Sequence, residues 1–300
     1  MAVRNVKLTV VYDGSEYHGW QIQPGLKTIQ GVLTEAIEKL IGGEVRVFGA
    51  SRTDAGVSAL GQVALVQIDS AIPVENLARA ITGRLPADIA VAEAVEVPQG
   101  FDLIGAVKSK LYRYTIFTGQ LRPVLQIRHC WHLPAPLEIP QKETKAQKGQ
   151  FGFPQGGVPL TGPAKLDVTA MAEAAKMLVG KKDFKSFASA ADQRENSVRT
   201  IFRCDVTTSL QYEIHHTHHK NSTQYATRNT QYENDWVYVD VEGDGFLYNM
   251  VRNIVGTLVE VGVGRMPSEK INEILEAKDR TAAGPIAPAA GLCLMCVKYA

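Results

Sequence analysis

The feature that most constrains the fold is one arrangement that occurs twice along the chain. A strand-like segment ends at Asp13-Gly14 with a helix-like segment further on, and another ends at Asp244-Gly245 with a helix-like segment directly after it. Asp-Gly pairs favour tight turns, because glycine adopts backbone conformations that other residues avoid. The repetition favours two related α+β halves whose sheets join and leave a cleft between them.

The spacing of apolar residues predicts the other elements. Strands are expected at residues 6–12, 44–48, 62–68, 89–97, 110–117, 197–207, 236–241 and 292–299. Helices are expected at residues 29–40 after a Thr28 cap, 74–81, 168–179 closed by Gly180, 246–261, and up to 277 after a Ser268 cap. We therefore predict an α+β fold: two related halves sharing one largely antiparallel mixed sheet, with helices on one face and a central basic cleft on the other.

Two polar segments interrupt the second half of the chain. Residues 141–165 are rich in Gln, Lys, Gly and Pro, and residues 211–234 are similarly polar. Such compositions are typical of surface loops. We predict an N-terminal α+β half at residues 1–107 and a C-terminal half at residues 108–300 that carries both insertions.

The bulk composition excludes several classes of protein. Four cysteines in 300 residues are far too few for a disulfide scaffold, which favours a reducing, cytoplasmic location. Charged residues interrupt the N-terminus, so no signal peptide is expected. No apolar run approaches the roughly 18 residues that a membrane span requires, and we expect no membrane association.

The segment at residues 48–57 is the strongest candidate for chemistry. It places Asp54, Arg52 and several small residues in a loop between two apolar strands. Small residues let a ligand approach the backbone closely, and an arginine two positions away can keep Asp54 ionised and oriented. An accessible, oriented carboxylate is a competent nucleophile. The alternative is a tight turn with a surface ion pair, and spacing alone leaves it open.

A basic stretch lies between Asp102 and Glu138, where no acidic residue occurs. It contains Lys108, Lys110, Arg113, Arg122 and Arg128, interleaved with Tyr112, Tyr114 and Trp131. Cations alternating with aromatic side chains suit a polyanion with stackable bases. The alternative is a solvated face of a strand and loop.

The loop around Asp54 resembles the signature of the tRNA pseudouridine synthase A family. GASRTDAGVSALGQV is similar to the family's G-R-T-D-A-G-V-H. The resemblance continues through YDGSEYHGWQIQP, KLYRYTIF, FLYNMVRNIVGTLVEVG, AKDRT and APAAGLCLMCVKY. Six separated motifs in the right order are far more specific than any one of them, and they span most of the chain apart from the polar insertions.

The resemblance implies roles for individual residues. Asp54 aligns with the nucleophilic aspartate, and Arg52 with the arginine of the same loop that helps displace the target base and pairs with the aspartate. Tyr112 aligns with the tyrosine that packs on uracil. Arg252 aligns with the arginine beside the catalytic aspartate, and a buried arginine in an apolar helix needs an anionic partner such as Asp54.

Four further residues are candidates for substrate binding. Phe246 and Leu247 would belong to the pocket wall, although they are also suited to the core. Lys110 and Arg113 would contact phosphates of the RNA backbone. Tyr112, taken alone, is better explained as an ordinary strand aromatic.

The chain departs from the family pattern at several positions. Ser51 replaces a glycine before the arginine, and Ser58 stands where histidine is common. The family often has Phe-His-Ala-Arg ahead of the tyrosine, whereas here Phe101 is followed by Asp102-Leu103-Ile104. A histidine and an arginine suited to RNA contact are therefore missing.

The resemblance implies an isomerase that needs no cofactor and no metal. Its partner would be tRNA, gripped by a homodimer, with uridines modified in the anticodon arm at positions 38–40. The carboxylate could add to uracil C6 or attack C1′, and the sequence leaves both open. Two other functions stay possible from the residues: a catalytically inactive RNA-binding protein of the same fold, and an unrelated hydrolase using Asp54 and an arginine.

Two metal-like patterns are not interpreted as metal sites. The histidine-rich run at residues 215–219 lies in a polar insertion, where a solvated loop is expected. Cys293 and Cys296 have the spacing of a zinc half-site, but no second pair completes it. We expect both to be buried structural thiols that point to opposite faces of a strand.

Overall fold

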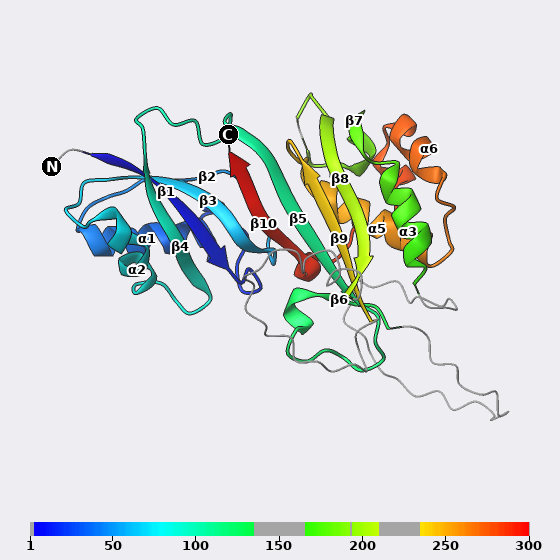
Figure 1. Ribbon diagram of the computed structural model, residues 1–300, viewed down its shortest axis with the longest axis horizontal. Helices are drawn as coiled ribbons and strands as arrows, with labels where there is room; N and C mark the ends of the chain where they lie inside the picture. The colour runs from blue at the N-terminus through cyan, green and yellow to red at the C-terminus, as the bar shows by residue number, and fades with distance from the viewer. Residues whose placement is uncertain (1–2, 135–165, 193, 210–234, 300) are drawn as a thin grey trace, which may run out of the picture.

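A computed structural model describes residues 3–134, 166–192, 194–209 and 235–299 (Figure 1). Both polar insertions, with the histidine-rich run, lie outside the described residues. Within the described part, the chain forms one sheet with helices packed against it, as the sequence predicts. No helix in this part is long and apolar enough to cross a membrane.

The sheet has ten strands, eight of them in the order β4-β1-β3-β10-β5-β9-β8-β7. Their bounds are β1 Arg4–Tyr12, β3 Ser58–Ile68, β4 Ile89–Val97, β5 Val107–Phe117, β7 Gly180–Asp183, β8 Val198–Thr208, β9 Trp236–Gly243 and β10 Leu292–Tyr299. Short strands β2 (Val47–Gly49) and β6 (Trp131–His132) pair with β3 and β5. Neighbours are antiparallel except β10 with β3 and β6 with β5.

The C-terminal strand joins the two halves of the sheet. β10 pairs with β3 in parallel through Cys293↔Ser58 and Leu294↔Ala59, and with β5 antiparallel along its length (Figure 1). One hydrophobic cluster runs through both sides of this junction. β5 begins at Val107, next to the predicted boundary between the halves, and the division at that residue remains a prediction.

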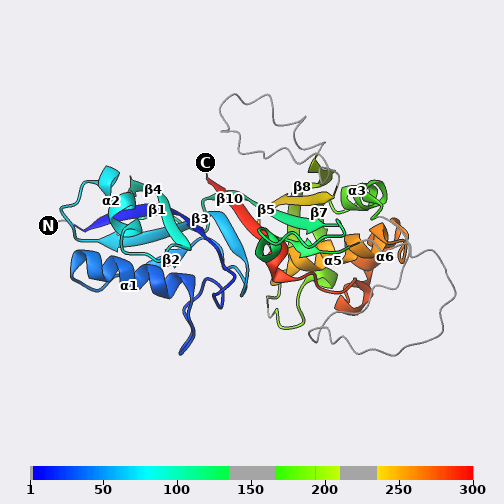
Figure 2. The same ribbon diagram turned by 90° about the horizontal axis from the view of Figure 1, so that it is seen from below.

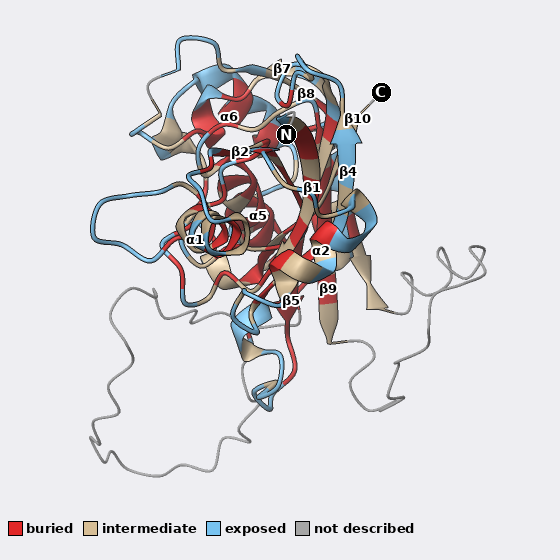
Figure 3. Cartoon of the chain, turned by 90° about the vertical axis from the view of Figure 1, so that its left-hand side faces the viewer, coloured by how far each residue is buried: buried red, intermediate tan, exposed pale blue. Residues whose placement is uncertain are grey.

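The helices are α1 (Ile29–Ile41), α2 (Val74–Thr82), α3 (Val168–Lys176), α5 (Met250–Gly262) and α6 (Lys270–Ala277). Figures 2 and 3 show α1, α5 and α6 on one side of the sheet. α1 has the predicted cap at its start, because the Thr28 hydroxyl accepts from the Gly31 N–H. The structure adds Gly42, which ends the helix with a left-handed φ of 74°.

Three predicted boundaries of the C-terminal helices are wrong, whereas the predicted end of α6 at Ala277 is confirmed. α3 ends at Lys176, and Gly180 begins β7 instead of closing the helix. α5 begins at Met250 and not at residue 246, because Asn249 has a left-handed backbone with φ of 61°. The residue before α6 is Glu269, with no side-chain cap, so Ser268 does not have the predicted capping role.

Two further expectations on the strands also differ. β3 begins at Ser58, earlier than residue 62, so the candidate loop is shorter than the sequence suggests. Cys293 and Cys296 are free and only partly buried, with a register shift between Leu294 and Cys296. Among the described residues, no group of three or more His, Cys, Asp or Glu side chains could hold a metal ion.

The turn at Asp13-Gly14 brings the end of β1 against the candidate loop. A Cβ on Gly14 would lie 2.0 Å from the backbone oxygen of Val57, and the Gly14 N–H donates to the Ser58 hydroxyl at 3.1 Å. The glycine is therefore required by close backbone approach and not by a special φ. The first Asp-Gly pair thus positions the loop that carries Asp54.

Gly14→Ala should destabilise the protein because its new methyl group meets backbone that cannot give way. We expect the free energy of unfolding to fall by about 1–3 kcal/mol, the usual cost of overpacking. Gly43→Ala is the matched control, since nothing lies within 4 Å of its Cβ position. Urea unfolding of both variants measures the difference, and equal stabilities would contradict the close contact.

Candidate active site

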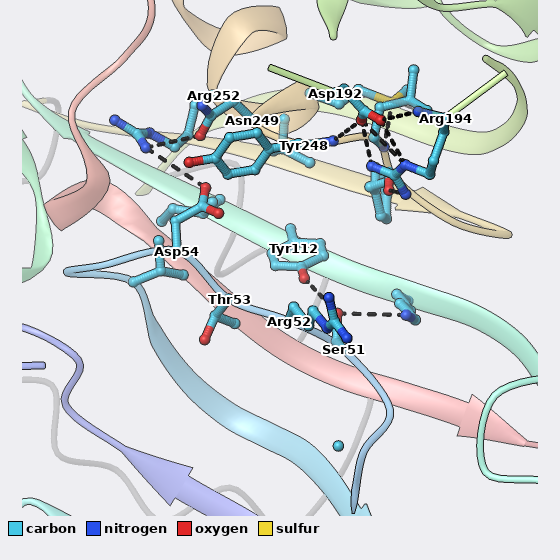
Figure 4. Close-up of a pocket in the computed structure, with 18 of the residues that line it drawn as sticks. Ser51, Arg52, Thr53, Asp54, Tyr112, Asp192, Arg194, Tyr248, Asn249 and Arg252 are labelled. Carbon is cyan, nitrogen blue, oxygen red and sulfur yellow. Dashed lines mark hydrogen bonds and ion pairs between the residues drawn. The ribbon is translucent and has the colours of Figure 1, made fainter. Parts of the chain in front are cut away.

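A pocket of about 680 Å³ lies between the two halves (Figure 4). Its lining comes from residues 49–54 and 57, from Ile104, Lys110, Tyr112 and Leu292, and from residues 191, 192, 194 and 246–252. The expectation of a cleft opposite the helices is wrong. Tyr112 lies on the buried face of β5, and the start of α5 forms a wall, so the pocket opens on the side of the sheet that carries α1 and α5.

The loop that carries Asp54 is held rigidly by buried side chains. Gln62, fully buried, donates to the Ser51 carbonyl at 2.6 Å and accepts from the Ser51 N–H at 3.2 Å. The Thr53 hydroxyl shares a hydrogen bond of 2.8 Å with the Tyr12 hydroxyl, and the Thr53 carbonyl accepts from the Trp20 N–H at 3.1 Å. The backbone on the N-terminal side of Asp54 is therefore fixed before any ligand arrives.

Asp54 faces Arg252 across the pocket, and this contact joins the two halves. The Arg252 Nη1 lies 3.6 Å from the Asp54 Oδ2. The guanidinium is itself anchored, because its Nε donates to the Ala287 carbonyl at 2.8 Å and its Nη1 donates to the Asn249 Oδ1 at 3.1 Å. The structure thus brings together the two residues that the resemblance places side by side.

The protonation of Asp54 reflects two opposing effects. Burial raises the pKa of Asp54, because desolvation disfavours its charged form, while Arg252 opposes the rise by stabilising the carboxylate. The side chain is still 21% exposed, so a ligand in the pocket can reach it. The site therefore holds a partly desolvated carboxylate next to a cation, as a nucleophile requires.

Arg52 lines the pocket but does not pair with Asp54. Its side chain is exposed, and in the part of the chain that the structure describes no ion pair links it to Asp54. Figure 4 shows Arg52 near Ser51 and Tyr112, on the far side of the loop from the carboxylate. The cation that fixes Asp54 comes from α5, and Arg52 remains available to a ligand.

Tyr112 is held from both sides. Its hydroxyl shares a hydrogen bond of 2.9 Å with the Ser51 hydroxyl, and its ring meets Phe246 edge to face at 5.2 Å between centroids. Burial raises the pKa of Tyr112 to about 12, so it stays a neutral phenol. Ser51, which departs from the family glycine, therefore supplies the partner of the Tyr112 hydroxyl.

Lys110 lies beside the same loop. Its ammonium donates to the Ala50 carbonyl at 2.7 Å and approaches the Ser51 hydroxyl at 3.4 Å. Burial, together with a smaller effect of the nearby Arg194 charge, lowers the pKa of Lys110 to about 8. Lys110 is thus a cation of the pocket whose charge would be stabilised by a bound anion.

The remaining predicted residues fall into two groups. Phe246 and Leu247 both line the pocket, as the resemblance implies. Leu247 is also almost fully buried, so it belongs to the hydrophobic core as well as to the pocket wall. Arg113 is not in the pocket lining. It points to the opposite face of β5, where its Nε and Nη2 donate to both carboxylate oxygens of Asp240 at 2.7 Å.

Several pocket residues carry no sequence signal that we recognised. Asp192, with its side chain 4% exposed, binds the guanidinium of Arg194, which also donates to the Phe246 carbonyl at 3.0 Å. Both lie in the segment between α3 and β8 that the sequence left unassigned. Tyr248 and Asn249 belong to the motif FLYNMVRNIVGTLVEVG. The structure places both in the turn before α5, where the sequence predicts helix.

The departures near residue 102 have a structural outcome. The Asp102 carboxylate accepts from the N–H groups of Ile104 and Gly105 at 3.1 and 2.7 Å, so it closes a turn. Ile104 is 68% exposed and lines the pocket rim. The position where the family often has arginine therefore borders the site, and here it is apolar.

Comparisons with known proteins give the family of the chain. A family model described as tRNA pseudouridine synthase matches residues 8–103 and 174–300. The tRNA pseudouridine synthase A of Caldicellulosiruptor saccharolyticus is 35% identical over 297 residues, covering 99% of this chain and all of that protein. The protein of the same name from Moorella thermoacetica is 38% identical over 296 residues, covering 98% and 99% of the two chains.

The fold and the matched sequence define a pseudouridine synthase, an isomerase that acts on RNA. The chain belongs to the tRNA pseudouridine synthase family, and its similarity to the two proteins named tRNA pseudouridine synthase A covers 98–99% of the chain. The family expected from the sequence motifs is confirmed.

Arg252→Ala should shift the pH dependence of activity. Because Arg252 lowers the pKa of Asp54 against the effect of burial, its loss raises that pKa further. With Asp54 reacting as a carboxylate, as the sequence predicts, the acid limb of kcat/KM should move to higher pH. Arg252→Lys, which keeps a positive charge, is the control and should move the limb less. A pH profile identical to that of the parent would show that Arg252 does not tune Asp54.

Ser51→Ala should loosen Tyr112 without changing the fold. The loss of one buried neutral hydrogen bond is worth about 1 kcal/mol, so we expect kcat to fall roughly five-fold. A double-mutant cycle with Tyr112→Phe tests the contact, because the two changes remove the same bond and their effects should not add. Additive effects on single-turnover rates would contradict this role for Ser51.

Proposed function

We propose that this protein converts uridine to pseudouridine in the anticodon stem-loop of tRNA, at positions 38–40, with Asp54 as its nucleophile. The observation that carries the proposal is the Asp54–Arg252 pair at 3.6 Å on the inner wall of the pocket. A carboxylate on a rigid loop, partly desolvated and held by a cation from the other half, is prepared to attack a bound base.

The reaction needs only a rearrangement of bonds within the substrate. The N1–C1′ bond breaks, the uracil rotates, and C5 bonds to C1′. C5 then loses its proton and N1 gains one, so the atoms of substrate and product are the same. Asp54 forms a transient bond to uracil C6 or to C1′, and both routes are compatible with its position. Arg252 keeps the carboxylate ionised before attack and stabilises it again when it is released.

The pocket provides for the base and for the backbone. Base chemistry on tRNA requires the target nucleotide to leave its stack, which costs a few kcal/mol. The apolar wall at Tyr112, Phe246 and Leu247 can receive the uracil, and the exposed Arg52 and the Lys110 ammonium can meet the phosphates beside it. A volume of about 680 Å³ is ample for one nucleotide.

The proposal extends to the assembly and its location. The family resemblance supports a cytoplasmic homodimer that grips tRNA across both subunits. Arg113, bound to Asp240 on the opposite face, would contribute to RNA binding only outside the pocket. Sedimentation of the protein with and without tRNA measures the number of subunits in the complex.

Asp54→Asn should abolish pseudouridine formation and leave tRNA binding nearly unchanged, because the amide keeps the shape but cannot act as the nucleophile. The test incubates parent and variant with an unmodified tRNA transcript and maps pseudouridine by position. Pseudouridine at tRNA positions other than 38–40 would contradict the proposed target positions. Turnover by the variant would contradict the role of Asp54. If the parent binds tRNA without changing any uridine, the protein is the inactive RNA-binding relative.

A further inference from the structure

Tyr248 is the most exposed aromatic side chain in the described lining of the pocket. It is 45% exposed, whereas Tyr112 is 6% exposed and Phe246 is partly buried. Figure 4 shows its ring projecting from the turn before α5, with Asp54 and Arg252 near its hydroxyl end. No hydrogen bond or ring contact of its side chain occurs among the described residues.

The backbone of Tyr248 is held by hydrogen bonds on both sides of the peptide unit. Its N–H donates to the buried Asp192 carboxylate at 2.7 Å, and its carbonyl accepts from the Ser189 N–H at 2.9 Å. Asp192 is in turn held by Arg194. The next residue, Asn249, takes the left-handed conformation that turns the chain into α5. An aromatic ring is thus presented on a rigid support, with no hydrogen bond or ring contact to the described part of the chain.

Tyr112 has little surface left for a base. Its hydroxyl is bound to Ser51, its ring edge meets Phe246, and 6% of the residue is exposed. Tyr112 can form the floor against which a base rests, but it offers little of a stacking face. Aromatic side chains that bind unpaired bases expose such a face, because stacking requires overlap of the two ring surfaces.

We propose that Tyr248 is a substrate-contacting residue that stacks on the uracil of the target nucleotide in the pocket. This inference rests on the proposed function and adds a second aromatic surface to it. Asp192 and Arg194 are then positioning residues that act through the backbone of Tyr248. The ring, and not the hydroxyl, makes the contact, so an aromatic replacement should preserve it.

Kinetics of three variants test the stacking contact in the full chain. Tyr248→Phe should keep kcat/KM within about two-fold of the parent, whereas Tyr248→Leu should lower it at least five-fold, the weak end of base–aromatic stacking. Phe202→Leu is the matched control, because Phe202 is 51% exposed on β8 and outside the pocket lining. Parent-like kinetics of Tyr248→Leu, or equal losses in Tyr248→Leu and Phe202→Leu, would overturn the proposal.

A binding measurement separates this proposal from the proposed function. The fluorescence of Tyr248→Trp should be quenched by a tRNA stem-loop with uridine at the target position and much less by one that is abasic there. Quenching of the same size by both RNAs would overturn the contact with the target base. Pseudouridine formation by the parent but not by Asp54→Asn decides the proposed function independently, whatever the behaviour of Tyr248.

Discussion

The ion pair between Asp54 and Arg252 requires that the two halves of the sheet be held at a fixed relative position. A carboxylate in a largely buried pocket is stable in its charged form only beside a cation. That cation comes from α5, in the other half of the sheet, so the halves must be fixed relative to each other. β10 achieves this by pairing with β3 on one side and β5 on the other.

Each partner of the pair is supported by polar contacts within its own half, buried ones at Ser51 and partly buried ones at Arg252. Gln62 binds both backbone groups of Ser51, while Ala287 and Asn249 hold the Arg252 guanidinium. These contacts leave the two charged groups few alternative positions. The sheet and the loops therefore fix the distance between the Asp54 carboxylate and the Arg252 guanidinium. The two groups are in place before a ligand binds.

The parts that the sequence predicts are those with local physical signals. Thr28 caps α1 as expected, and the Asp54 loop stands out through its small residues and charges. The predictions that were wrong, and the contacts that were missed, depend on residues distant in the sequence. Gly180 resembles a helix end but serves β7, and the bonds from Gln62 to Ser51 join strand and loop in a way that no spacing reveals. Arg113 shares the basic stretch with Lys110, yet strand alternation sends it to the opposite face.

The loss of the expected arginine at Ile104 changes which cations can serve the substrate. Of the cations in the described pocket lining, Arg252 is committed to Asp54 and Arg194 to Asp192. Arg52 and Lys110 remain, one exposed and one beside the loop with its pKa lowered to about 8. A phosphate at Lys110 would restore the full charge that burial disfavours, so binding of the RNA backbone and protonation of this lysine favour each other.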